Sequence, residues 1–161
     1  MLKELEPLVS QYARSRQVLF STIEALTDEQ LDECFPERDW SIKDTMSHVA
    51  ANEKLMTKLL RDIAKGTTNA LPADFDNQKF NDETVAAGRA KSREQLIAGL
   101  NESYQSMIGV LETITEDEIH RRGVHPAAGE VDAKEFFLAM YAHHEVHCRD
   151  IVEQSRRVKK G

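Results

Sequence analysis

Two histidines near the C-terminal end of the chain, His143 and His147, are four residues apart in what reads as one long helix. This spacing puts both imidazoles on one helix face, with Cβ atoms about 5–6 Å apart. A single metal ion can bind both rings at that separation. A complete site also needs a third ligand elsewhere in the chain and a helix face that points into the protein.

The helix that carries this pair is predicted from a capping sequence at Asp132 to about Arg157. One row of its residues follows the alternating three- and four-residue spacing of a single helix face. The row consists of Phe136, Met140, His143, His147, Asp150 and Gln154. Because it starts with large apolar residues, both histidines are expected to face the interior.

A second helix with a histidine is predicted from Ile42 to about Lys65. Ser41 and Asp44 form its N-terminal capping signal, and Gly66 is typical of a helix end. Its inward row consists of Thr45, His48, Asn52, Leu55, Leu59 and Ile63. His48 therefore adds a third imidazole on an inward face.

The remaining sequence predicts two further long helices, from about Leu5 to Leu26 and from about Arg93 to Ile114. A helical piece that begins near Asn81 is either a broken start of the latter helix or a collinear neighbour, since Gly88 weakens it. Residues 66–80 are expected to be irregular and to carry a crossover or a function.

Short helical turns are predicted after the capping residues Thr27 and Thr115, and Pro36 is expected to end the first of them. Residues 121–131 read as a turn-rich loop. Four long helices, short turns between them and no internal repeat predict an all-α four-helix bundle. The 161 residues (1–161) suit a single domain with a long crossover loop.

Composition narrows the range of partners and locations. A formal net charge of −7 argues against nucleic acid or an anionic membrane as the main partner. The sequence shows no apolar run of transmembrane length and no secretory signal, so we expect a cytoplasmic protein. The two cysteines, Cys34 and Cys148, do not indicate a disulfide scaffold, and Cys34 is expected to be a buried small residue.

Three inward imidazoles from two facing helices are an efficient way to bind a divalent metal ion in a bundle core. Neutral imidazole suits zinc, nickel, cobalt or iron better than magnesium or calcium. Three protein ligands leave positions open for water or substrate. The simpler alternative is that His48, His143 and His147 are buried structural residues bonded to backbone or carboxylate groups.

The segment from Trp40-Ser-Ile-Lys-Asp through His48 to Glu53 and the motif His143-x-x-x-His147-x-x-Asp150 resemble two motifs of the DinB/YfiT-like superfamily. The resemblance covers residues 5–157. It implies a four-helix bundle with a three-histidine metal site on His48, His143 and His147, often with nickel or zinc, and frequently a homodimer. Some relatives are thiol-dependent isomerases or transferases that use mycothiol, bacillithiol or glutathione, and others resemble hydrolases.

A second pair with the same spacing, His144 and Cys148, lies one residue along the helix. A shift of the helix phase by one residue would make this pair the ligands. The inward row and the resemblance favour His143 and His147, and His144 is then expected to be partly exposed or at a helix interface.

Several polar residues are further candidates. Glu53 is the tentative catalytic carboxylate, with a solvated surface role as its alternative. Asn52 could line the pocket, and Asp150 could orient an imidazole. Asp74, Asp76 and Asn77 could cover the open side of the metal, although a solvated loop is the simpler interpretation. His120 and His125 are expected at the surface, and Trp40 in the core.

These observations predict a metal-dependent enzyme that acts on a small electrophilic substrate. The metal would activate water for hydrolysis or a low-molecular-weight thiol for transfer, and the resemblance slightly favours thiol transfer. The alternative is a non-catalytic small-molecule-binding or stress-response protein whose histidines are structural.

Overall fold

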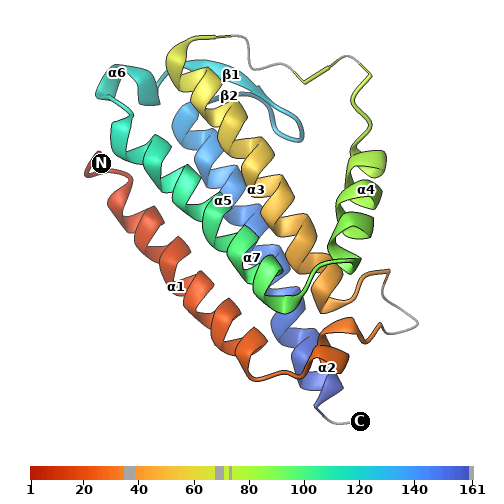
Figure 1. Ribbon diagram of the computed structural model, residues 1–161. Helices are drawn as coiled ribbons and strands as arrows, with labels where there is room; N and C mark the ends of the chain where they lie inside the picture. Colours follow the sequence, from red (N-terminus) through yellow and green to blue (C-terminus); the bar gives the residue numbers. More distant parts are fainter. Residues whose placement is uncertain (35–38, 68–70, 73, 160–161) are drawn as a thin grey trace.

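The computed structural model describes residues 1–34, 39–67, 71–72 and 74–159 (Figure 1). Four long helices form the bundle: α1 (Glu6–Glu24), α3 (Ile42–Lys65), α5 (Arg93–Thr113) and α7 (Ala133–Val158). Shorter helices connect them: α2 (Asp28–Asp32), α4 (Asn77–Arg89) and α6 (Glu116–Ile119). The predicted four-helix bundle is confirmed.

Local capping signals set the starts of most helices. In α3, the Ser41 hydroxyl accepts a hydrogen bond from the Asp44 amide at 3.1 Å, and the Asp44 carboxylate accepts one from the Ser41 amide at 3.2 Å. Gly66 ends the helix in the left-handed conformation, with φ of 67°. Such a cap contributes about 0.5–2 kcal/mol. The bounds of the helix that carries His48 therefore follow directly from the sequence.

The region before α5 differs from the prediction. The helix α4 begins at Asn77, with Asp76 as its capping residue, and packs against α3. Figure 1 shows α4 beside α3 and out of line with α5, so the collinear arrangement was wrong. At Gly88 a Cβ atom would lie 2.3 Å from Cβ of Ser47, so glycine permits the close approach of α4 to α3.

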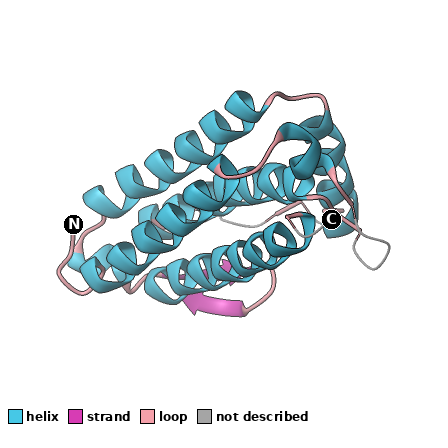
Figure 2. Cartoon of the chain, turned by 90° about the horizontal axis from the view of Figure 1, so that it is seen from below, coloured by secondary structure: helices cyan, strands magenta, loops and turns pink. Residues whose placement is uncertain are grey.

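The segment predicted as a loop, residues 121–131, contains a β-hairpin. Strand β1 (Arg122–His125) pairs antiparallel with β2 (Gly129–Asp132), and Gly129 takes a positive φ of 76° at the turn. The hairpin contacts α3 and α7 on one side of the bundle (Figure 2). Two strands of four residues lack the alternating apolar pattern that would have revealed them.

The core consists of two apolar clusters with a buried polar layer between them. One cluster surrounds Tyr12, Phe136 and Phe137, and the other surrounds Leu19, Met46 and their neighbours. Each long helix places one buried polar residue between the clusters. These residues are Arg16 on α1, Glu53 on α3, Ser103 on α5 and His144 on α7.

Cys34 is exposed, so its prediction as a buried residue was wrong; it lies beyond the end of α2, outside both apolar clusters. Pro36 lies outside the described residues. Within the described part of the chain, no helix combines the length and apolar character needed to cross a membrane.

Candidate metal centre

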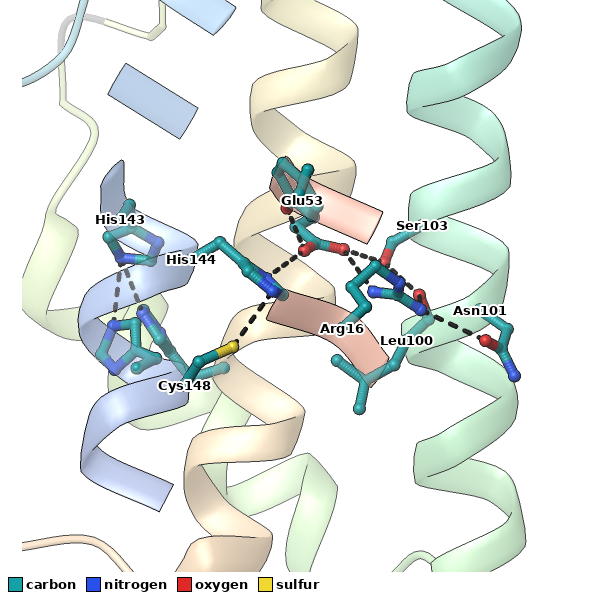
Figure 3. Close-up of polar contacts among 11 residues, drawn as sticks. Arg16, Glu53, Leu100, Asn101, Ser103, His143, His144 and Cys148 are labelled. Carbon is teal, nitrogen blue, oxygen red and sulfur yellow. Dashed lines mark hydrogen bonds and ion pairs between the residues drawn. The ribbon is translucent and has the colours of Figure 1, made fainter. Parts of the chain in front are cut away.

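Three imidazoles converge where α3 faces α7. His48 comes from α3, and His143 and His147 come from successive turns of α7. The Nε2 atom of His143 lies 3.3 Å from Nε2 of His48 and 3.2 Å from Nε2 of His147, and Figure 3 shows both contacts as dashed lines from His143. One ligand atom from each ring lies within 4.8 Å of the others. The structure thus brings together the three histidines that the sequence singled out.

Trp40 and Asp150 lie next to these rings. Trp40 precedes the cap of α3, and the centroid of its ring lies 4.7 Å from that of His48 and 6.3 Å from that of His147. Trp40 is half-buried beside the cluster, so its assignment to the core was wrong. Asp150 approaches His147 from one turn further along α7, with 3.8 Å between Oδ2 and Nδ1.

The environment keeps the three rings neutral near pH 7. Burial, together with His147 and His143, lowers the pKa of His48 to about 3. Burial, together with His147, lowers the pKa of His143 to about 4. Burial also lowers the pKa of His147. Neutral rings keep a lone pair free for coordination.

The nitrogen geometry fits a shared cation better than hydrogen bonds among the rings. His143 Nε2 has one proton or one lone pair, so it cannot make two well-directed hydrogen bonds, yet two ring nitrogens approach it. Nitrogen ligands of a tetrahedral zinc ion lie about 2.0–2.1 Å from the metal and therefore about 3.3–3.4 Å from one another. The two separations at His143 are close to this value, and all three ligand atoms lie within 4.8 Å of one another. The three residues present therefore fit a divalent metal ion.

The cluster opens into a cavity of about 270 Å³ between α3, α4, α7 and the hairpin. Asn52 lines this cavity, as predicted, and α4 contributes Asn77 and Asn81. Asp74 and Asp76, which were also predicted to cover the open side of the metal, do not line the cavity. Asp76 caps α4, and Asp74 is exposed. The cavity gives a small molecule access to the open side of the three histidines.

His125 also lines this cavity and is half-buried, so its placement at the surface was wrong; His120 is exposed as predicted. The Nδ1 atom of His125 accepts hydrogen bonds from the amides of Ala127 and Ala128, both at 3.1 Å. In the neutral ring the proton must therefore be on Nε2. The histidine was missed because the hairpin that positions it was missed.

Glu53 belongs to the buried polar layer rather than to the surface. It is 4% exposed, so the solvated alternative was wrong. Its Oε1 atom accepts hydrogen bonds from the Tyr12 hydroxyl and from His144 Nδ1, the latter at 2.9 Å, and its Oε2 accepts from Ser103 at 2.6 Å. Arg16 lies 3.9 Å away. The contacts of Glu53 are with this layer, which Figure 3 shows on the other side of α7 from His143.

The alternative ligand pair, His144 and Cys148, faces α1 instead of His48. His144 is 1% exposed at the helix interface, and its Nε2 lies 3.0 Å from Cys148 Sγ. Burial raises the pKa of the Cys148 thiol to about 12. The sequence did not single out Tyr12, Arg16 or Ser103 as partners of Glu53, because they are 37 to 50 residues away along the chain.

Together the fold and the site define a four-helix-bundle protein with a three-histidine cluster at a cavity. The chain belongs to the DinB superfamily, whose family model matches residues 11–151. A protein of Oceanobacillus iheyensis whose name proposes a metal-dependent hydrolase is 25% identical over 133 residues, which cover 83% of this chain and 75% of that protein. YfiT of Bacillus subtilis, named in the same way, is 25% identical over 143 residues, covering 87% and 78%.

Solved structures show the same fold. The structure of Bacillus subtilis YfiT superposes with a TM-score of 0.77 at 22% identity, covering 99% of this chain and 90% of that one. A mycothiol-dependent maleylpyruvate isomerase superposes with a TM-score of 0.76 at 15% identity, covering 91% of this chain. The chain spans 60% of the length of that isomerase. At these identities the structural likeness concerns the fold alone.

Proposed function

We propose that this protein is a metal-dependent enzyme in which His48, His143 and His147 hold a divalent ion. The observation that carries this proposal is the convergence of three neutral imidazole nitrogens beside a cavity, within 4.8 Å of one another. When bound, such an ion supplies a Lewis acid that lowers the pKa of a water or thiol at its open positions. The names of the two bacterial relatives are consistent with this assignment.

The side chains around the cavity would bind and orient a small substrate. Trp40 forms an apolar wall beside the histidines, and Asn52 offers an amide. His125 offers an Nε2 proton, because its Nδ1 is held by two backbone amides. A substrate with an oxygen acceptor next to its reactive atom would bind against this donor. A volume of about 270 Å³ limits the substrate to a small molecule.

The reaction that we propose is attack on a small electrophile by water or by a low-molecular-weight thiol. Nickel and zinc are the proposed metals, because three neutral nitrogens suit both ions. The catalytic role assigned to Glu53 stays a prediction. Its carboxylate contacts His144, which is the neighbour of His143 on α7, and so any influence on the cluster would pass through that helix.

Metal analysis tests the site. Untagged protein purified without chelator should contain close to one equivalent of a divalent metal, measured by inductively coupled plasma mass spectrometry. The His48→Ala and His147→Ala variants should lose it, while His120→Ala, which removes an exposed histidine, should keep it. If both cluster variants retain the metal of the parent protein, the proposed site is wrong.

An activity screen separates the enzyme from a non-catalytic binding protein. Monochlorobimane with cysteine or glutathione reports thiol transfer, and p-nitrophenyl acetate reports hydrolysis. Turnover that requires added nickel or zinc and disappears in His48→Ala supports the enzyme. A protein that turns over no substrate of either class, with or without added metal, and still binds small molecules in the cavity would support the binding protein.

A further inference from the structure

Three residues on the α1 side of α7 form a continuous chain of polar contacts that the metal centre does not use. Cys148 Sγ lies 3.0 Å from His144 Nε2, and His144 Nδ1 lies 2.9 Å from Glu53 Oε1 (Figure 3). All three are buried, with 6%, 1% and 4% of their surface exposed. Cys148 is a nucleophile, His144 is a base beside it, and Glu53 is a carboxylate that orients the base. Activated nucleophiles have this arrangement.

The carboxylate fixes which nitrogen of His144 is basic. Glu53 Oε1 lies against Nδ1, and an ionised carboxylate only accepts hydrogen bonds, so Nδ1 carries the proton. The lone pair of the neutral ring is then on Nε2, which faces the sulfur. Arg16, 3.9 Å from Glu53, offsets the negative charge of the carboxylate. The buried thiol stays protonated at rest, and His144 is oriented to receive its proton as the sulfur attacks.

A groove leads to this thiol from the surface. It has a volume of about 620 Å³, runs between α1 and α7, and has Cys148 among its lining residues. Ser15 and Val18 line it from α1, and Tyr141 and Val152 line it from α7. Among the described residues, none that lines this groove also lines the cavity at the three histidines. A small molecule could reach Cys148 without passing the metal centre.

We propose that Cys148 is a second reactive centre, which captures small α,β-unsaturated carbonyl compounds from the groove between α1 and α7. His144 Nε2 takes the thiol proton as the sulfur attacks the β-carbon. An S–C bond forms, the C=C π pair moves to the α-carbon and its carbonyl, and the proton passes from His144 to the α-carbon. The addition is complete without an oxidant, a leaving group or the metal ion.

Labelling with N-ethylmaleimide tests this centre. The folded Cys34→Ser protein, which has Cys148 as its one remaining cysteine, should gain a single adduct on Cys148, located by intact-mass and peptide analysis. His144→Gln should slow the labelling at least about tenfold, because general base assistance typically contributes about 10²–10⁴-fold. His120→Gln, which removes an exposed histidine outside both the groove and the three-histidine cluster, should label at the rate of the parent.

Equal rates in the His144→Gln variant and its parent, or no adduct on Cys148 in the folded protein, would overturn the proposal. This result is distinguishable from failure of the metal centre, which is measured by metal content.

A second variant separates labelling through the groove from labelling through unfolding. Val18 lines the groove and is 52% exposed, so Val18→Trp should narrow the groove with little effect on the fold. Labelling of Cys148 should then slow, while the melting temperature stays at the parent value. If Val18→Trp leaves the rate unchanged, and the rates across the variants follow their melting temperatures, the thiol reacts only on unfolding and the proposal is wrong.

Discussion

The two faces of α7 place adjacent histidines in opposite chemical settings. His143 faces α3, where its Nε2 atom meets two other imidazole nitrogens. His144 faces α1, where one of its nitrogens contacts Glu53 and the other contacts Cys148. On the α3 face, imidazole nitrogens meet one another and cannot all be joined by hydrogen bonds. On the α1 face, each nitrogen of His144 contacts a different protein side chain.

This difference indicates what each face can do. Buried polar groups normally have hydrogen-bond partners, so a cluster that lacks them points to a ligand from outside the chain. Among the described residues, His48 Nδ1 on the α3 face and Arg16 Nη1 on the α1 face are both buried without a hydrogen-bond partner, so the difference between the faces lies in the contacts of the other ring nitrogens. On the α1 face, the polar layer links all four long helices, and it should contribute to stability whether or not a ligand is bound. Changes on the two faces should therefore have separable effects.

The largest effect is expected from removing the carboxylate of the α1 face. Glu53→Ala leaves Arg16 buried without its counter-charge and removes the acceptor of Tyr12, Ser103 and His144. Breaking a buried pair from one side costs about 3–5 kcal/mol. The free energy of unfolding, measured with urea, should fall by that amount, whereas the isosteric Glu53→Gln should lose less. Because both variants remove the charge and only glutamine keeps an acceptor oxygen, equal losses would assign the whole effect to the charge and contradict a contribution from the hydrogen bonds.

The next effect concerns metal affinity on the α3 face. His143→Ala should weaken zinc or nickel binding about 100-fold or more, since one of three ligands is lost, while His144→Ala should weaken it far less. Isothermal titration of metal-free protein measures both. Because the two histidines are adjacent, they form a matched pair in which only the helix face differs. If His144→Ala weakened metal binding more than His143→Ala, the metal would belong to the α1 face.

Sequence patterns sufficed for the features that local chemistry determines. The bounds of α3 follow from Ser41, Asp44 and Gly66, because caps depend on residues within one turn. The spacing of His143 and His147 on α7, together with the inward row of α3, indicated that the three imidazoles meet. The inward row predicted for α7 did not give the phase of that helix correctly, since the buried residues of the helix include His144 and Cys148 while His143 and His147 are half-buried at the edge of that face.

Features that depend on distant residues could not be predicted. The partners of Glu53 come from α1, α5 and α7, and only the packed bundle brings them together. The hairpin that holds His125 in the cavity consists of two short strands stabilised by each other and by contacts with α3 and α7. Its sequence carries turn signals but too few residues for a strand pattern.

A smaller effect should follow from Ser103→Ala. This change removes one donor to Glu53, the 2.6 Å hydrogen bond to Oε2, and leaves the other donors in place. Hydrogen bonds to charged groups contribute about 1.5–3 kcal/mol. Urea unfolding should show a loss in that range, with metal content unchanged. A loss of metal in this variant would show that the two faces are coupled.

The smallest effect is the pH dependence of the metal-free protein. Burial lowers the folded-state pKa of His48 to about 3 and of His143 to about 4, below the value near 6.5 of the unfolded chain. Between these values the unfolded chain binds more protons, so stability is full above pH 6.5 and falls as the pH drops toward 4. Thermal melts should show this decline, about 1 kcal/mol or less per ring between pH 6.5 and 5.5. The slope should flatten in His48→Ala, and an unchanged slope would contradict this assignment.

The most direct test of the two-face account is the position of a metal ion in a crystal grown without chelator and soaked with zinc or nickel. Anomalous scattering should place one ion about 2.0–2.1 Å from the Nε2 atoms of His48, His143 and His147. His144 should keep its contacts with Glu53 and Cys148 in the same crystal. An anomalous peak between His144 and Cys148, or no peak at the three histidines at saturating metal, would contradict the account.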